Sequence, residues 1–407
     1  MREEKIPQGY KQTEIGTIPE DWEISELQNA VDFLDGLRRP VKSGDRAKIS
    51  GIYPYYGASG IVDYVNDFIF DDELILLGED GENILSRNLP LAFKVSGKIW
   101  VNNHAHVMKP KNDFDIGYLN DFLESLDYSL LNSGTAQPKL NKQNCLKSKV
   151  AKPSLKEQTL IATALSDVDT LISELEKLIA KKQAIKTATM QQLLTGKTRL
   201  PQFSLREDGT KKGYKQSELG KIPEDWEIDK IGNVVSITTG DKNTQDKVTD
   251  GLYPFFVRSQ QVEKINSFSF DGEAVLTAGD GVGTGKIFHY INGKFDFHQR
   301  VYLMHNFFEK LDGYYFYIFF SNHFYERIMS MTAKSSVDSV RREMIADMPI
   351  ILPTKQEQTA IAKILSDMDS EIQALEKRLV KTRQIKQGMM QELLTGKTRL
   401  LQGTVNT

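Results

Sequence analysis

The 407-residue sequence contains a single cysteine, Cys145. One cysteine excludes an internal disulfide framework and a cysteine-rich metal site. No apolar run approaches the ~20 residues that a transmembrane helix needs, and the charged first residues are not followed by the apolar core of a secretory signal. We therefore expect a cytoplasmic protein that does not bind a membrane.

The chain also lacks a strong charge of either sign. It has 52 Lys and Arg against 55 Asp and Glu, a formal net charge of -3. This balance does not exclude a nucleic-acid partner, because DNA binding needs only a local basic patch. A hydrophobic content of 40% is typical of a folded chain, and the length indicates two or three domains.

Nucleotide-binding and catalytic motifs are missing as well. GKT occurs at 196–198 and 396–398, but Gln191 and Gln391 stand where a P-loop needs glycine. GDGVGTGK at 279–286 departs from the same pattern. The amino-methyltransferase N/D-P-P-Y/F motif, a nuclease-like Asp…Glu-x-Lys pattern and a Ser-His-Asp arrangement are also absent. We predict no catalytic site, no cofactor and no metal.

A large internal repeat dominates the sequence. GYKQTEIGTIPEDWEI at 9–24 and GYKQSELGKIPEDWEI at 213–228 are identical at 13 of 16 positions. Residues 153–200 and 353–400 are identical at 27 of 48, and both end in LLTGKTRL. The chain is therefore a tandem duplication of a unit of about 200 residues.

The segments between these matched parts have diverged. Only short islands still match, such as YPYY at 53–56 with YPFF at 253–256, and GEDG at 78–81 with AGDG at 278–281. We interpret the matched parts as a scaffold and the diverged parts as its two interchangeable heads.

The segments 153–200 and 353–400 are predicted to form long helices. Ser154 with Glu157, and Thr354 with Glu357, have the spacing of a capping box, and Gly196 and Gly396 end the helices. About 40 residues give a rod of roughly 60 Å. Each carries an apolar stripe with alternating spacings of four and three, typical of a coiled-coil seam. Two separate surface helices are the alternative. The stripes are Ile161, Leu165, Val168, Ile172, Leu175, Ile179 and Ile361, Leu365, Met368, Ile372, Leu375, Leu379.

Each head is predicted to be a mixed α/β (α+β) globule. ELILLG at 73–78 and EAVLTAG at 273–279 indicate strands, whereas 118–126 and 314–320 indicate core helices. The expected organisation is a first head at 1–152, a first long helix at 153–200, a linker at 201–212, a second head at 213–352, and a second long helix with a tail at 353–407.

A basic segment precedes each long helix. Residues 132–152 contain five lysines and no acidic residue, with amide and hydroxyl residues between them. Lysine, serine and backbone amides bind phosphate, whereas glutamine, asparagine and arginine read base edges. We therefore expect a DNA-contacting segment in each copy, the alternative being a solvated loop. The candidates are Ser133, Thr135, Gln137, Lys139, Asn141, Lys142 and Lys147, and in the second copy Lys334, Ser335, Ser336, Ser339, Arg341 and Arg342.

His104 and His106 form an H-x-H pair that would place both rings on one face of a strand. No third ligand for zinc stands nearby, and the second copy has His298 and Arg300 at what we take to be the equivalent place. An arginine argues against metal. We interpret these four residues as part of a polar surface facing a polyanion, the alternative being a surface or packing role.

The duplicated head-plus-helix organisation, with IPEDWE near the start of each head and LLTGKTRL closing each helix, resembles the specificity subunit of type I restriction-modification systems. The resemblance covers nearly the whole chain. It implies that each head is a target recognition domain reading one half of a split site in double-stranded DNA. It also implies that the helices pair antiparallel as a spacer and dock two modification (methyltransferase) subunits, which motor-nuclease subunits join.

Two other functions are alternatives. The chain could itself methylate or cut DNA, although the missing motifs argue against that. It could also be a coiled-coil adaptor without DNA contact, in which case footprinting would show no protected split site.

Overall fold

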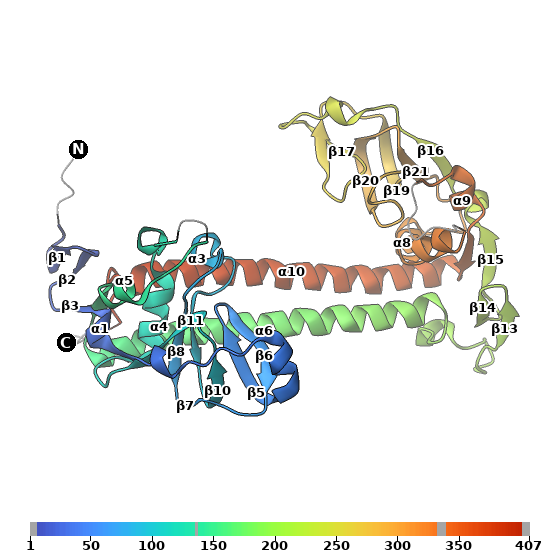
Figure 1. Cartoon of the computed structure of the whole chain (residues 1–407). Coiled ribbons are helices and arrows are strands. Elements are labelled where there is room, and N and C mark those ends of the chain that lie inside the picture. The colour runs from blue at the N-terminus through green and yellow to red at the C-terminus, as the bar shows by residue number, and fades with distance from the viewer. Residues whose placement is uncertain (1–5, 135–136, 332–338, 401–407) are drawn as a thin grey trace, which may run out of the picture. The chain divides into compact units, whose positions relative to one another are not determined.

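The computed structural model describes residues 6–134, 137–331 and 339–400. The chain forms two compact units. Unit 1 comprises residues 1–177 and 376–407, and unit 2 comprises residues 178–375. Each unit thus contains one head, the beginning of the long helix that follows it and the end of the other long helix (Figure 1).

The two long helices are confirmed. Helix α6 spans Leu155–Leu194 and helix α10 spans Lys355–Leu393. Gly196 follows α6 with φ of +69°, and a side chain there would approach Pro223 to 2.5 Å. Glycine is therefore required both by the left-handed backbone and by the close packing. Within the described residues, no helix combines the length and apolarity needed to cross a bilayer.

Head 1 contains two four-stranded sheets, with strand orders β6-β5-β10-β7 and β4-β11-β8-β9, and two two-stranded ladders, β1-β2 and β12-β3. The predicted strand at 73–78 is β8, which is fully buried, and the predicted helix at 118–126 is α4. The strands are β1 Tyr10–Thr13, β2 Gly16–Pro19, β3 Glu23–Glu26, β4 Val31–Phe33, β5 Ser50–Gly57, β6 Gly60–Val65, β7 Phe70–Asp71, β8 Leu74–Gly78, β9 Ala92–Val95, β10 Lys98–Val101, β11 Ala105–Pro110 and β12 Lys149–Lys152. The helices are α1 Leu27–Ala30, α2 Ser43–Arg46, α3 Asn83–Ser86, α4 Ile116–Ser125 and α5 Lys142–Leu146.

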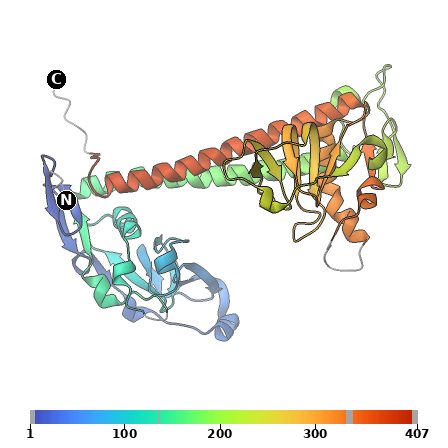
Figure 2. The same ribbon diagram turned by 90° about the horizontal axis from the view of Figure 1, so that it is seen from above.

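Head 2 has one six-stranded sheet of order β16-β21-β19-β20-β17-β18, drawn in yellow to orange in Figure 2, and the ladders β13-β14 and β15-β22. Its strands are β13 Tyr214–Ser217, β14 Gly220–Pro223, β15 Glu227–Lys230, β16 Ser236–Thr239, β17 Tyr253–Phe256, β18 Glu263–Ile265, β19 Phe270–Ala278, β20 Phe288–Phe297, β21 Val301–His305 and β22 Pro349–Leu352. Its helices are α7 Ile231–Val234, α8 Gly313–Ser330 and α9 Arg342–Ala346. The predicted strand at 273–279 lies in β19 and the predicted helix at 314–320 in α8. The mixed α/β class with two repeated domains is confirmed.

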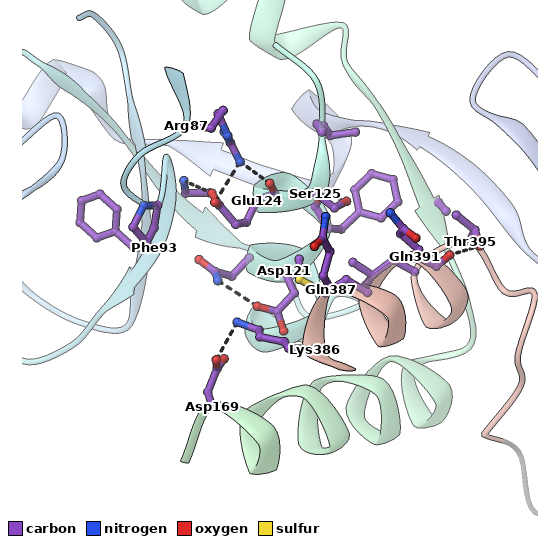
Figure 3. Close-up of a pocket in the computed structure, with 18 of the residues that line it drawn as sticks. Arg87, Phe93, Asp121, Glu124, Ser125, Asp169, Lys386, Gln387, Gln391 and Thr395 are labelled. Carbon is purple, nitrogen blue, oxygen red and sulfur yellow. Dashed lines mark hydrogen bonds and ion pairs between the residues drawn. The ribbon is translucent and has the colours of Figure 1, made fainter. Parts of the chain in front are cut away.

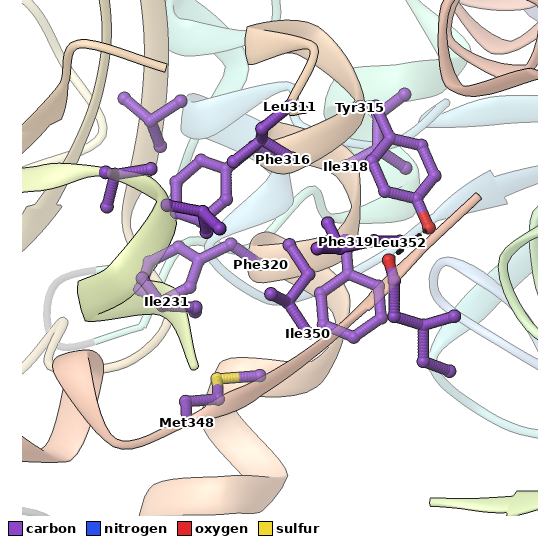
Figure 4. Close-up of a cluster of buried hydrophobic side chains, with 14 of the residues drawn as sticks. Ile231, Leu311, Tyr315, Phe316, Ile318, Phe319, Phe320, Met348, Ile350 and Leu352 are labelled. Atoms are coloured by element: carbon purple, nitrogen blue, oxygen red, sulfur yellow. Dashed lines mark hydrogen bonds between the residues drawn. The ribbon is translucent and has the colours of Figure 1, made fainter. Parts of the chain in front are cut away.

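Each core includes both long helices. In unit 2, Phe316, Phe319 and Phe320 of α8 pack with Ile350 of β22 (Figure 4). The same cluster contains Ile361 and Leu365 from the start of α10, and Leu193 and Leu194 from the end of α6. The unit 1 cluster contains Ile161, Leu165, Leu393 and Leu394. Burial of these leucines and isoleucines holds each head to the ends of both helices.

An ion-pair cluster in unit 2, which we call the Arg199 clasp, consists of Arg199, Asp225, Trp226 and Glu357. Arg199 donates two hydrogen bonds to Asp225 at 2.7 and 3.1 Å, and Nε donates to Glu357 Oε1 at 3.0 Å. Trp226 Nε1 donates to Glu357 at 3.0 Å, and the guanidinium lies 5.7 Å from the Trp226 ring centre. The Glu357 side chain is 1% exposed, so its charge depends on these partners.

Unit 1 contains the same arrangement, the Arg399 clasp, made by Arg399, Asp21, Trp22 and Glu157. Arg399 donates to Asp21 at 2.9 and 2.8 Å and to Glu157 Oε2 at 2.8 Å. Trp22 Nε1 donates to Glu157 Oε2 at 3.0 Å. IPEDWE, the helix start and LLTGKTRL, the strings that match between the copies, therefore meet in each unit.

The expected capping box is only half formed. Ser154 Oγ accepts a hydrogen bond from the Glu157 backbone N–H at 3.3 Å. The Glu157 carboxylate, however, is engaged by Trp22 and Arg399. An ion pair with a guanidinium joins two opposite charges, whereas the capping bond would join the carboxylate to an uncharged backbone N–H, which explains the difference.

Within each unit, ion pairs join the two long helices. In unit 1, Lys386 lies 2.7 Å from Asp169 and Arg383 lies 2.6 Å from Glu176. In unit 2, Lys182 lies 2.7 Å from Glu371, and Lys186 pairs with Asp369. In both units, later residues of one helix meet earlier residues of the other, so the contacting segments run antiparallel.

Candidate nucleic-acid interface

In head 1, backbone hydrogen bonds hold the basic segment against the turn that follows β8. We call residues 132–142 basic loop 1. Asp80 and Lys139 form an antiparallel bridge. The Leu140 N–H donates to Glu79 O at 2.8 Å, and the Gly81 N–H donates to Pro138 O at 3.0 Å. The GEDG island and the basic segment, far apart in sequence, therefore form one surface.

Head 2 repeats this arrangement after β19. Asp280 and Ser339 form the corresponding bridge, and the Val340 N–H donates to Gly279 O at 2.7 Å. We call residues 331–342 basic loop 2, of which Met331 and residues 339–342 are described. Lys334, Ser335 and Ser336 lie outside the described residues, as does Thr135 of basic loop 1.

Most described candidates of head 1 have accessible side chains. Ser133, Gln137, Lys139 and Lys147 are exposed. Lys139 Nζ lies 3.4 Å from Glu79 while its side chain remains 51% exposed, so this pair is too weak to withhold the amine from a phosphate.

Two further candidates are half-buried. Asn141 caps α5 by accepting from the Asn144 N–H at 2.9 Å, and Lys142 Nζ lies 5.3 Å from the Phe33 ring centre. In head 2, Ser339, Arg341 and Arg342 are exposed. The structure therefore gathers the described candidates of each copy at one anchored loop and the short helix that follows it.

The acidic residue of each turn has a basic side chain beside it. His104, half exposed, lies 2.8 Å from Asp80, and Arg300 lies 3.7 Å from Asp280. Both ladders place these residues at the same position, because the Glu79 N–H donates to His104 O and the Gly279 N–H donates to Arg300 O, each at 2.8 Å. The two side chains flank the basic loops.

The expected pairing of histidines between the copies is wrong by two residues. His104 corresponds to Arg300. His298 corresponds to Asn102, because the Asn102 N–H donates to Tyr56 O and the His298 N–H donates to the equivalent carbonyl, Phe256 O. His298 is 4% exposed and its Nδ1 accepts from the Arg300 N–H at 2.9 Å. Burial, together with Arg258 and Arg300, lowers the pKa of His298. The neutral, buried ring of His298 therefore supports the turn and is not part of the exposed surface.

His106 is also buried, at 1% exposure. Its Nδ1 lies 2.7 Å from Asp35 Oδ2 and its Nε2 lies 3.0 Å from Leu140 O. Strand alternation explains the interior position only in part, because His104, two residues away, has left the strand and faces solvent. A direct DNA contact by His106 is therefore contradicted by its burial.

One exposed cation was not anticipated from the sequence. Arg258, which follows β17, donates to Asp280 Oδ1 at 2.8 Å and is 42% exposed. It adjoins the turn that anchors basic loop 2. The YPFF island two residues earlier is its only sequence signal, and that island does not indicate which neighbouring side chain reaches the surface.

Clusters of metal-binding side chains and cavities are two other features that could mark a functional site. Among the described residues, no group of three His, Cys, Asp or Glu side chains could hold a metal ion. A cavity of about 880 Å³ in unit 1 is lined by α4 and the end of α10 (Figure 3). Its lining includes the ion pairs of Lys386 with Asp169 at 2.7 Å and of Arg87 with Glu124 at 2.9 Å, and none of its lining residues belongs to basic loop 1.

Two similar heads, each with an anchored basic loop and each held by long helices, define a class of protein: a tandem, two-headed recognition protein. The model of the type I restriction modification DNA specificity domain matches residues 19–187 and 223–384. The chain belongs to this family and carries two copies of its domain.

Individual relatives agree. The type I restriction enzyme MjaVIII specificity subunit of Methanocaldococcus jannaschii is 28% identical, over 94% of this chain and 94% of that protein. The EcoDI specificity subunit of Escherichia coli is 32% identical over 43% of this chain and 38% of that protein. The crystal structure of the S subunit of a type I restriction-modification system from M. genitalium has the same fold, with a TM-score of 0.67, 12% identity and coverage of 96% of this chain and 97% of that one.

Proposed function

We propose that the chain is the non-catalytic DNA-recognition subunit of a type I restriction-modification complex in which each head reads one half of a split, asymmetric target. One observation carries this proposal: both heads present a basic loop anchored at the same turn by the same backbone contacts. Equivalent anchoring positions both loops alike, while different exposed side chains read different bases.

The candidate side chains of the two loops divide by chemistry. Lys139, Lys142 and Lys147 provide phosphate contacts that hold the duplex without regard to sequence. Gln137 in head 1, and Arg341 and Arg342 in head 2, have the donors and acceptors that read base edges. His104 and Arg300 extend these surfaces beside the loops.

The proposal extends to the long helices, which we infer form an antiparallel coiled coil that sets the distance between half-sites. The ion pairs between α6 and α10 in both units support it. Leu175, Ile179 and Ile372 are buried, whereas Val168, Ile172, Met368, Leu375 and Leu379 are half-buried, as expected for a two-helix seam. Ile161, Leu165, Ile361 and Leu365 serve the head cores as well.

The family also indicates the partners. As the resemblance to type I restriction-modification specificity subunits implies, we propose that two modification subunits supply the methyl donor and its chemistry, and that motor-nuclease subunits complete the cytoplasmic restriction enzyme.

Mapping of methylated adenines in the host genome, with and without this gene, tests the function. We expect one split, asymmetric motif to lose methylation when the gene is deleted. Methylation by the purified chain alone would support a stand-alone enzyme, and an unchanged genome with no footprint on DNA would support a structural adaptor.

The spacer is tested by inserting one heptad into each long helix. A heptad preserves the seam and lengthens the rod by roughly 10 Å, about three base pairs. The half-sites should persist while the gap between them grows. Full activity with an unchanged gap would contradict the proposed spacer.

A further inference from the structure

The two heads hold their basic loops by different side chains at one strand position. In head 1, His106 lies opposite Leu77 of β8, and its Nε2 is 3.0 Å from Leu140 O. In head 2, Tyr302 lies opposite Thr277 of β19, and its hydroxyl donates to Val340 O at 3.1 Å. The two carbonyls are equivalent, because the N–H groups of Leu140 and Val340 donate to the turn carbonyls of residues 79 and 279.

The residue whose carbonyl accepts this bond, Leu140 or Val340, lies between candidate DNA-contacting residues. Leu140 separates Lys139 from Asn141, and Val340 separates Ser339 from Arg341. Both are buried, at 0% and 5% exposure. A shift of one residue at this point would turn the flanking side chains away from the surface they now share.

Both nitrogens of the His106 ring face acceptors, so the ring must carry two N–H groups. Nδ1 faces Asp35 Oδ2 at 2.7 Å while Nε2 faces the Leu140 carbonyl, and a neutral imidazole carries only one N–H. Glu79 Oε2 lies 3.8 Å from Nδ1, and Arg38 donates to Glu79 at 2.7 Å.

Phe33 meets the His106 ring edge-on, and Lys142 lies over the Phe33 ring. Burial alone would lower the pKa of His106, but the hydrogen bonds to Asp35 and Cys145 raise it to about 10. His106 is therefore an imidazolium at neutral pH.

We propose that His106 and Tyr302 are positioning residues for DNA reading: each donates a hydrogen bond to a carbonyl near the C-terminal end of its basic loop, Leu140 O or Val340 O, and so fixes the register in which the neighbouring side chains face the bases. The inference rests on the proposed function of the heads. It assigns a role in half-site selectivity to two side chains that do not touch DNA.

The sharpest test is Tyr302→Phe, which removes one oxygen atom. The full chain, assembled with its modification subunits, is titrated with the genomic target and with targets altered at single bases in either half. Loss of one such bond should reduce selectivity in the second half-site about 5- to 10-fold. First-half selectivity and salt dependence should stay close to wild type, and the thermal midpoint should fall by no more than about 4 °C.

His106→Phe is the counterpart in head 1 and should relax only the first half-site, with partial recovery in His106→Tyr, which restores a donor at this position. Nitrogen NMR of the wild-type ring at pH 8 should show both nitrogens protonated. A neutral ring, or variants that melt earlier while keeping full half-site selectivity, would overturn the proposal. Absence of specific binding by the wild type would instead contradict the proposed function.

Discussion

The Arg199 and Arg399 clasps have the same residue types and the same hydrogen bonds, whereas the interiors of the two heads beside them differ. Each clasp has an arginine, an aspartate, a tryptophan and a glutamate, with the same tryptophan–glutamate distance of 3.0 Å. Their contacts are directional and charged, so every member constrains the others. A loop anchor needs only one donor, and so a histidine and a tyrosine can fill the same role.

The space beside α4 and α8 shows the same contrast. Asp115 and Asp312 cap these helices equivalently, each beside the same glutamine contact, Gln158 or Gln358. Two and five residues beyond its cap, α4 has Gly117 and Asn120, whereas α8 has Tyr314 and Tyr317.

Aromatic rings therefore fill in unit 2 what is a cavity in unit 1. Tyr290 packs edge-on against Tyr314 at 4.9 Å between ring centres. The ladders place Lys94, which lines the cavity, at the position of Tyr290. Many different side chains can fill the same volume. A buried ion pair, in contrast, requires particular charged residues.

The largest expected effect is on a half-length chain. Residues 1–212 contain Asp21, Trp22 and Glu157 together with Arg199, the equivalent of Arg399. In a symmetric dimer, Arg199 of one copy can close the clasp of the other, because a two-fold interface presents the same surface twice. With modification subunits, this fragment should methylate an interrupted palindrome built from the first half-site, as sequencing of the methylated sites would show.

The same fragment carrying Arg199→Ala is the control and should dimerise more weakly in light scattering. Retention of the asymmetric target, or a strictly monomeric fragment at micromolar concentration, would contradict the pseudo-symmetric organisation.

The clasps themselves should differ in strength. Arg199→Ala leaves Glu357 buried without its cation, which should cost about 3 kcal/mol in unfolding free energy. Arg399→Ala should cost less, because the Arg399 side chain is 27% exposed against 5% for Arg199. Urea unfolding with hydrogen exchange at the Trp22 and Trp226 indoles would separate the units.

Arg206→Ala provides the matched control for the clasps. Its pair with Glu224 is exposed, at 46% and 37%, and exposed pairs contribute about 0–1 kcal/mol. Equal losses for Arg199→Ala and Arg206→Ala would refute a stabilising role for the clasp.

Loop chemistry can be tested in head 1 alone. Lys142→Ala with Lys147→Ala should weaken binding to all sequences and lower the salt slope by up to about 2. Gln137→Ala should instead relax selectivity in the first half-site only. Lys181→Ala, on the exposed surface of α6, is the control for the lysine pair. A changed base preference with an unaltered salt slope would show that the lysines do not contact phosphates.

The smallest effect concerns pH. His106 has a pKa raised to about 10 in the folded chain, above the ordinary value of 6.5. Its stabilisation is complete below pH 6.5 and declines as the pH rises towards 10. Burial raises the pKa of Tyr302, so its hydroxyl remains a donor throughout this range.

Denaturant unfolding at pH 6, 8 and 10 would therefore distinguish the anchors. The stability difference between wild type and His106→Gln should shrink as the pH rises, whereas that between wild type and Tyr302→Phe should stay constant. Parallel behaviour of both pairs would show that His106 is not charged.

Local patterns were sufficient for much of the architecture. The duplication predicts two heads, the apolar stripes and flanking glycines predict α6 and α10, and the lysine-rich segment predicts an exposed basic loop. Each depends on residues close in sequence, where periodicity, capping and composition act directly. For the head interiors the sequence predicted only the mixed α/β class, because many combinations of side chains fill the same space.

Only the tertiary structure decided which distant groups meet. Arg199 and Glu357 are 158 residues apart, and no local pattern indicates that the end of one long helix belongs to the head that precedes the other. His104 and Arg300 share a position that the H-x-H spacing alone had misassigned by two residues. Burial of apolar surface and pairing of buried charges select such contacts across the whole chain, since their free energy depends on what surrounds a group and not on its sequence neighbours.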